Sequence, residues 1–183
     1  EYILKRMKKD LDRSLYYHDI YHTLDVIDSS KRIAFSENVS GDELLILLTA
    51  AAFHDSGMIL SYENHEEASV LLAKDILSEF EYTPDDIDRV SELIMVTKLP
   101  RNAVSKLEKI ICDADLDYLG REDFFEIASK LKKEWSVRGV NYSEKEWCRY
   151  QIDFLMSHKY FTVAARETRE KGKKENISKM QGK

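Results

Sequence analysis

Four of the five histidines lie within one segment of fewer than fifty residues: His18, His22, His54 and His65. His18 and His22 are four residues apart, so on one helix they would share a face. His54 and Asp55 directly follow an apolar segment, Leu44 to Phe53, where burying an unpaired imidazole and carboxylate would be costly. A metal ion would remove that cost, because it neutralises the carboxylate and accepts the lone pair of the imidazole. A hydrogen bond between the two side chains at a helix end is the alternative.

A second polar cluster alternates along the chain at Asp113, Asp115 and Asp117, after an amphipathic segment. This alternation is similar to the start of a calcium-binding EF-hand loop. Such a loop, counted from Asp113, needs Gly at its sixth position and Glu at its twelfth. The chain has Tyr118 and Phe124 there, which excludes the calcium loop.

Three segments, taken together, resemble the HD superfamily of metal-dependent phosphohydrolases: YHDIYHTLDV (17–26), AAAFHDSGM (50–58) and CDADLDYLG (112–120). They follow the family order of a His, a His-Asp doublet and a later Asp, and the resemblance covers about residues 14–135. It implies four metal ligands: His22, His54, Asp55 and Asp113. Two imidazoles and two carboxylates suit Fe, Mn, Zn, Ni or Co, and Asp55 is expected to reach a second ion such as Mg.

The first segment also resembles the His-containing motif of cyclic-nucleotide phosphodiesterases, which implies that His18 is the general acid. Asp55 is the other residue expected to be catalytic. Met58 stands where those phosphodiesterases have a further histidine, so their cyclic-nucleotide specificity does not follow. We expect His65 to face a second metal or the substrate phosphate, and Lys98 or Arg101 to offer positive charge to a phosphate. The alternative is that these are ordinary surface residues.

The expected activity is hydrolysis of a phosphomonoester or phosphodiester by a metal-activated water, on a nucleotide or a nucleotide-like second messenger. The alternative is a non-catalytic module that senses a metal or nucleotide within a larger signalling protein, since the sequence begins at Glu1. An oxygenase with a di-iron centre is a third reading, but the extra histidine ligands that it needs are not evident.

The composition limits which binding partners and which cellular location are expected. A net charge of −6 argues against binding to a nucleic acid backbone, which requires clustered Lys and Arg. The longest apolar run is far shorter than the roughly 20 residues that cross a bilayer, so no membrane contact is expected. Two cysteines and the lack of a signal-peptide pattern favour a cytoplasmic location.

Helices must position these residues, because the 183 residues include only six Gly and two Pro and show no alternating strand pattern. Helix starts are predicted at Ser40, Asn64, Thr83 and Ser143, each with a capping pattern or a following proline. We expect an all-α, single-domain irregular bundle over residues 1–165. Residues 166–183 are basic and poor in large apolar side chains, which predicts a mobile tail. We expect the C-terminal helices to serve either packing or the contact of a homodimer.

Overall fold

The computed structural model describes residues 1–182, and these form an all-helical structure without strands, which confirms the predicted fold class. The elements in chain order are α1 (Tyr2–Asp10), α2 (Ile20–Ser36), α3 (Gly41–Phe53), the 3-10 helix η1 (Ser56–Ile59), α4 (His65–Leu77), α5 (Pro84–Met95), α6 (Lys106–Asp115), the 3-10 helix η2 (Asp117–Gly120), α7 (Phe124–Val137), α8 (Glu144–Ser157) and α9 (Val163–Gln181). No described helix is long and apolar enough to cross a membrane.

The predicted helix starts differ in how they are capped. Thr83 and Ser143 each form a reciprocal capping box, in which the cap hydroxyl and a carboxylate three residues later satisfy two backbone amides. Ser105, at the start of α6, forms a third that the sequence reading did not include. Ser40 and Asn64 begin their helices without a side-chain cap hydrogen bond. The capping pattern therefore located four helix starts, but not always through the expected hydrogen bond.

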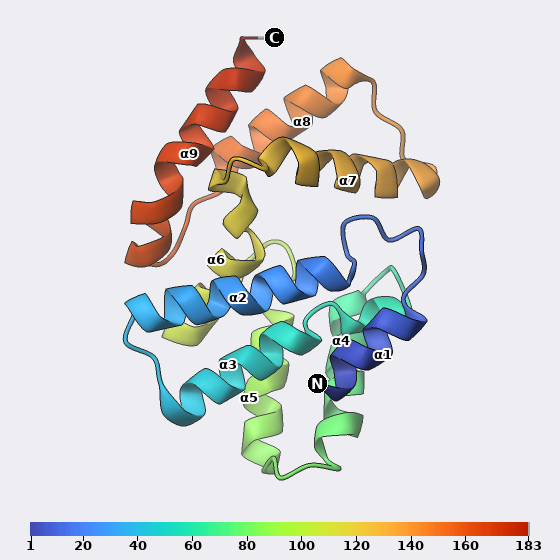
Figure 1. Ribbon diagram of the computed structural model, residues 1–183, viewed down its shortest axis with the longest axis vertical. Helices are drawn as coiled ribbons and strands as arrows, with labels where there is room; N and C mark the ends of the chain where they lie inside the picture. The colour runs from blue at the N-terminus through green and yellow to red at the C-terminus, as the bar shows by residue number, and fades with distance from the viewer. Residues whose placement is uncertain (183) are drawn as a thin grey trace.

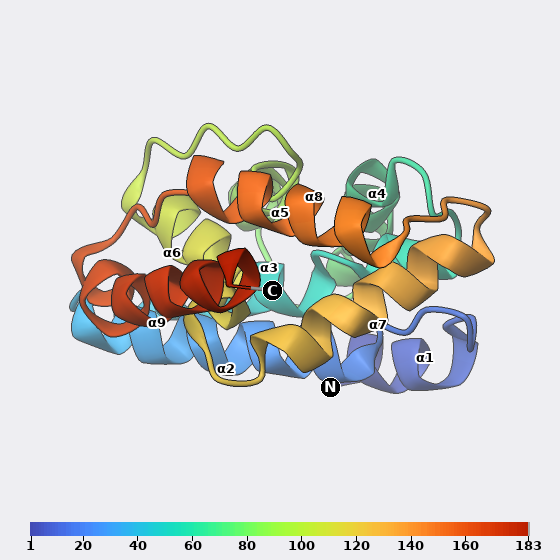
Figure 2. The same cartoon turned by 90° about the horizontal axis from the view of Figure 1, so that it is seen from above.

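The helices form two layers that share α2 and α6 as their boundary (Figure 1). Helices α1 to α6 enclose one apolar core, which includes Ile33, Leu47 and Ile94. Helices α7 and α8, together with η2 and α9, enclose a second core around Phe124 and Leu155. Viewed from above, α7 and α8 run over the elements of the first layer (Figure 2). The two layers leave polar side chains of α2 and α6 between them.

Residues 166–181 are the main departure from the predicted domain limits, because they are helical and packed rather than a mobile tail. Few large apolar side chains are needed here, since polar contacts hold the helix. Arg169 pairs with buried Asp117, and the amide of Asn176 donates to the carbonyls of Leu119 and Arg121. The backbones of α9 and η2 also come close, and a Cβ placed on Gly172 would lie 2.1 Å from the Gly120 carbonyl oxygen.

Candidate metal centre

His54 and Asp55 lie where α3 ends, and local hydrogen bonds fix their orientation. The Nδ1 of His54 lies 2.8 Å from the Ala51 carbonyl oxygen, to which it donates, so the lone pair is on Nε2. Ser69 holds the following turn, because its hydroxyl donates to the His54 carbonyl and accepts from the Gly57 amide. The turn has no room for a side chain, since a Cβ on Gly57 would lie 2.0 Å from the His65 carbonyl oxygen.

Four side chains converge at this point from α2, α3 and α6. The Nε2 of His22 lies 3.0 Å from Asp115 Oδ1 and 3.4 Å from Asp55 Oδ2. The Nε2 of His54 lies 3.2 Å from Asp55 Oδ2, 3.6 Å from Asp115 Oδ1 and 3.4 Å from His22 Nε2. Ligands bonded to one ion at about 2.0–2.2 Å lie about 3 Å from one another, so these spacings suit a shared ion.

The oxygen Asp55 Oδ2 gives an independent test of that fit. It is buried, and no hydrogen bond satisfies it among the described residues. A buried carboxylate oxygen without a partner is costly, and a cation is the partner that would remove the cost. His22, His54 and Asp115 are all buried and form a potential metal site by the distances between their ligand atoms. The residues therefore fit a divalent ion.

Asp115, and not Asp113, is brought to this cluster, which corrects the ligand expected at the later aspartate. Asp113 points the other way, because residues two apart on a helix lie on nearly opposite faces. Its oxygens accept from the amides of Phe161 and Thr162 at 2.8 and 2.7 Å and from the Thr162 hydroxyl at 2.7 Å. Asp113 thus anchors the loop that leads into α9.

Arg101 holds Asp115 in place from the side away from the histidines. Its guanidinium pairs with Asp115 Oδ2 and also donates to the carbonyls of Cys112 and Thr97. Burial alone would raise the pKa of Asp115, but Arg101 and the two histidines hold that pKa well below its usual value. Oδ1 therefore faces the cluster as part of an ionised carboxylate. Sequence reasoning had considered Arg101 only as a phosphate contact.

His18 lies beside this cluster but not on the helix of His22, since α2 begins at Ile20 with Asp19 as its cap. The two rings still meet, with centroids 6.1 Å apart. The Nδ1 of His18 is 2.5 Å from Glu134 Oε1, and Glu134 Oε2 accepts from the His18 and Tyr17 amides. Burial would raise the pKa of Glu134, but these hydrogen bonds lower it, which keeps the carboxylate ionised.

Glu134 was not among the residues predicted from the sequence. It is completely buried in α7, far along the chain from His18, and it has no family motif around it. A carboxylate in an otherwise amphipathic helix gives little indication of a functional role in the sequence. Only tertiary contacts explain why Glu134 is buried.

His65 and Lys98, the two expected substrate contacts, differ in their surroundings. His65 Nε2 lies 3.4 Å from Asp55 Oδ1 and 3.5 Å from Glu66 Oε1, so it faces the second oxygen of the shared carboxylate. The ammonium of Lys98 pairs with Glu67 and lies 3.3 Å from the Asn64 side-chain oxygen. Lys98 therefore borders the site with its charge already paired.

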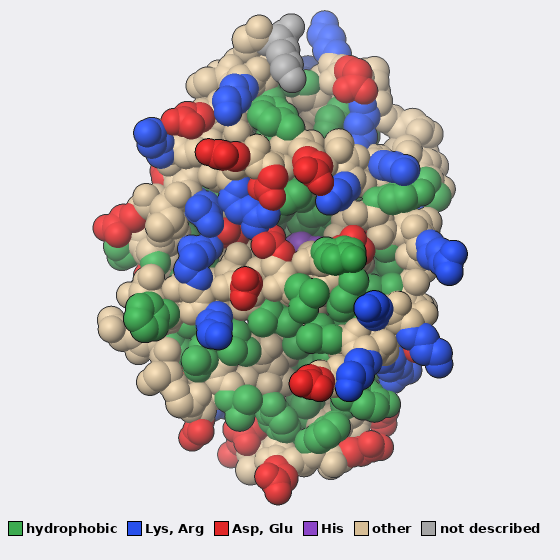
Figure 3. All heavy atoms as spheres, in the orientation of Figure 1, with side chains coloured by type: hydrophobic (Ala, Val, Ile, Leu, Met, Phe, Trp, Pro, Cys, Tyr) green, Lys and Arg blue, Asp and Glu red, His purple; other side chains and the backbone are tan. Residues whose placement is uncertain are grey.

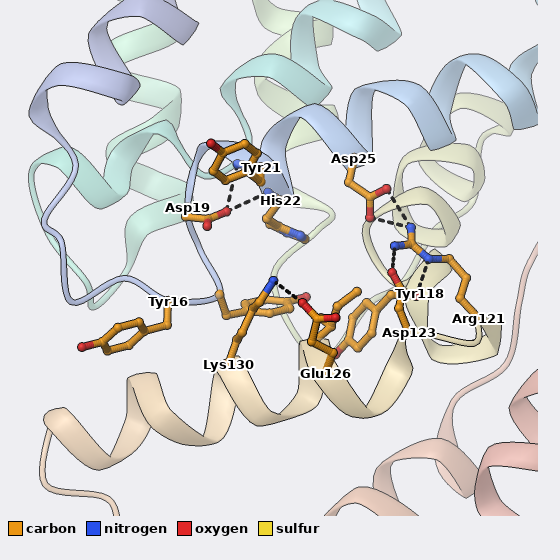
Figure 4. A pocket seen from close by; sticks show the side chains of 12 residues that line it. Tyr16, Asp19, Tyr21, His22, Asp25, Tyr118, Arg121, Asp123, Glu126 and Lys130 are labelled. Carbon is orange, nitrogen blue, oxygen red and sulfur yellow. Dashed lines mark hydrogen bonds and ion pairs between the residues drawn. The ribbon is translucent and has the colours of Figure 1, made fainter.

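Two cavities reach the cluster from different sides. One of about 400 Å³ is lined by Asp55, Asp115, His18 and His65 at one end and by apolar residues of α7 and α8 at the other. A second of about 240 Å³ lies between α2 and α7 and includes His22 (Figure 4). Histidine, in purple, is visible between acidic and basic side chains on the face of the molecule drawn in Figure 3. The larger cavity has the size of a small-molecule site.

Comparison with known proteins agrees with this fold. A crystal structure of a predicted HD superfamily hydrolase from an uncultured Thermotogales bacterium is 24% identical, has a TM-score of 0.66, and matches over 98% of this chain and 86% of its own. Bacillus subtilis YpgQ, solved in complex with ADP, is 20% identical with a TM-score of 0.67, over 99% of this chain and 93% of its own.

A sequence relative and a family match extend the comparison. An uncharacterized protein of Clostridium beijerinckii is 36% identical over 98 residues, which are 51% of this chain and 62% of that relative, so the match spans less than two thirds of the relative. Residues 16–117, more than half of the chain, match the HD domain. The chain therefore belongs to the HD domain family.

Proposed function

We propose that the protein is a metal-dependent phosphohydrolase that cleaves a phosphomonoester or phosphodiester bond of a nucleotide. The observation that carries this proposal is the convergence of His22, His54, Asp55 and Asp115 on one buried point at the end of a cavity. Asp55 Oδ2, buried without a hydrogen bond among the described residues, supports a cation there. We propose Fe, Mn, Zn, Ni or Co as the ion.

A divalent ion bound there would polarise a phosphoryl oxygen and lower the pKa of a bound water molecule toward neutrality. Side chains and backbone groups of the protein hold the ligand atoms in position. Arg101 orients Asp115, and the Ala51 carbonyl orients His54, so the ligand atoms are fixed before substrate arrives.

We propose that His18 protonates the leaving oxygen. Its Nδ1 hydrogen bond to Glu134, an ionised carboxylate, fixes the ring and leaves Nε2 for the substrate. Tyr62 supports this arrangement, since its hydroxyl donates to the same Glu134 oxygen at 3.1 Å. Glu134 is thus a positioning residue and His18 the proposed acid.

The two oxygens of Asp55 face different partners, which favours a second, weaker site. Oδ2 faces His22 and His54, whereas Oδ1 faces His65. Glu66 adds a further oxygen near His65. We propose that a second ion such as Mg, or the substrate phosphate through His65, occupies that side.

A nucleotide is the proposed substrate because the cavity combines the ligand cluster with apolar walls, and YpgQ, which shares the fold, was solved with ADP. A nucleotide-like second messenger has the same combination of phosphate and base.

The test combines elemental analysis with hydrolysis assays on the wild type and on His54→Ala and Asp115→Ala. The substrates are bis(p-nitrophenyl) phosphate and a panel of nucleotides, with Mn²⁺ added. Asp113→Asn is the matched control, since that carboxylate is bonded elsewhere. We expect metal and turnover in the wild type and the control, and loss of both in the two ligand variants. Tight nucleotide binding without turnover would instead favour a sensing module.

A further inference from the structure

The larger cavity is chemically divided along its length. One end carries the ligand cluster and the ionisable side chains. The other end is walled by Leu116, which follows Asp115 directly, and by four apolar and aromatic residues of α7 and α8: Leu131, Trp135, Tyr150 and Phe154. A molecule that fills the whole cavity must therefore combine an anionic part with a flat or apolar part.

The aromatic wall comes from α7 and α8. The Trp135 and Tyr150 rings meet edge to face, with centroids 5.3 Å apart and an angle of 70°. Tyr150 and Phe154 are one helical turn apart, and their rings are nearly parallel, at 8°, with centroids 6.5 Å apart. Aromatic faces of this kind stack on nucleobases, but they accept every base because each base has a π face.

One polar side chain interrupts this apolar end. Gln151 borders the cavity and is only 3% exposed. Its side-chain oxygen Oε1 is buried and has no hydrogen-bond partner in the described part of the chain. A buried carbonyl oxygen without a hydrogen bond is unfavourable. A ligand that donates a hydrogen bond to it would therefore gain more binding free energy than from the same hydrogen bond exposed to water.

We propose that the apolar end is a nucleobase subsite and that Gln151 makes it selective for bases that carry an exocyclic amine beside a ring nitrogen, as adenine does. The amine donates to the Gln151 oxygen, and the ring nitrogen matches the NH₂ group of the same carboxamide, the pairing by which Gln recognises adenine in nucleic acids. The aromatic wall binds the face of the base while the phosphates reach the cluster. This inference rests on the proposed function for the identity of the ligand, but base recognition is measurable without turnover.

The experiment uses two probes that differ only by the amine, adenosine 5′-diphosphate and purine riboside 5′-diphosphate. Binding to the metal-free protein is followed by the fluorescence of Trp135 and Trp147, and hydrolysis is followed separately with Mn²⁺. We expect the wild type to bind the amine-bearing probe about fivefold to tenfold more tightly, the range of one net hydrogen bond. In Gln151→Met, which keeps the length of the side chain, the two affinities should agree within about twofold.

Circular dichroism of the metal-free protein serves as the control for folding, and Gln151→Met should have the same helical spectrum as the wild type. If the wild type binds both probes equally, the assignment of Gln151 is overturned, and no variant is needed for that result. A preference that persists in Gln151→Met overturns it as well. If the probes are distinguished but no phosphoester is cleaved, the subsite stands and the proposed hydrolase activity fails.

Discussion

Replacing Asp113 and Asp115 with asparagine, one at a time, separates an anchoring role from a metal-binding role on the same helix. Asp113 accepts three hydrogen bonds from the 161–162 loop, two of them buried and one partly buried. Asparagine keeps one acceptor oxygen and loses the charge. Hydrogen bonds to charged groups are worth about 1.5–3 kcal/mol each, but burial raises the pKa of Asp113 and offsets part of that gain. We therefore expect Asp113→Asn to lower the free energy of unfolding by about 2–3 kcal/mol.

For a chain of this length, each kcal/mol lowers the melting temperature by about 2–4 °C, so Asp113→Asn should melt about 4–12 °C below the wild type. Its metal content should be unchanged, because its carboxylate does not face the cluster. The measurement is calorimetric melting with and without Mn²⁺. A ligand at 100 times its Kd stabilises the folded state by about 2.7 kcal/mol, and Asp113→Asn should keep that metal-dependent increase.

Asp115→Asn should show the opposite combination. It removes a ligand oxygen from the cluster, so added Mn²⁺ should no longer raise the melting temperature. Arg101 also loses its carboxylate partner, although the carbonyls of Cys112 and Thr97 still accept from it. The reasoning is refuted if Asp113→Asn abolishes the metal-dependent increase while Asp115→Asn retains it, since that would restore the assignment made from the sequence.

Three further predictions concern α9, the partly buried His158 and the positioning of the proposed acid. Gly172→Ala should destabilise the protein, because a Cβ there would meet the backbone of η2, whereas in an unpacked helix the same change would stabilise it by about 1 kcal/mol; thermal melting decides. Burial and the nearby Lys173 lower the pKa of His158 to about 3. Below about pH 6.5 His158 is therefore protonated in the unfolded chain but not in the folded chain. The free energy of unfolding should fall by about 2 kcal/mol from pH 7 to pH 5 for this reason. Denaturant unfolding should show this decrease in the wild type and not in His158→Gln. Glu134→Gln should lower kcat at least about tenfold with a smaller change in KM; an unchanged kcat, or an equal change in KM, would contradict the positioning role.

Much of the fold followed from local patterns in the sequence. The capping boxes at Thr83 and Ser143 gave helix starts that the structure contains, because capping depends on residues three apart. The basic segment after Arg166 was expected to be mobile, since composition measures apolar burial and misses specific polar contacts. Arg169 bonded to buried Asp117 and the close glycine backbones of α9 and η2 depend on tertiary packing, which composition does not contain.

In the candidate site, too, local sequence patterns identified some residues and tertiary packing determined the others. The His-Asp doublet and His22 were found from motifs, but choosing between Asp113 and Asp115 needed the direction in which α6 faces. Periodicity could not give that direction, because residues 112–117 are all buried. Glu134 is separated from His18 by 116 positions, so only the folded arrangement of α7 pairs them.

The position of a bound ion would decide whether His22, His54, Asp55 and Asp115 form a metal centre. A crystal of the protein grown with Mn²⁺ would be measured at a wavelength where manganese scatters anomalously. We expect an anomalous peak among His22 Nε2, His54 Nε2, Asp55 Oδ2 and Asp115 Oδ1, at about 2.0–2.3 Å from each. Absence of a peak among these atoms in a crystal containing Mn²⁺, or a peak on Asp113 instead, would contradict this assignment.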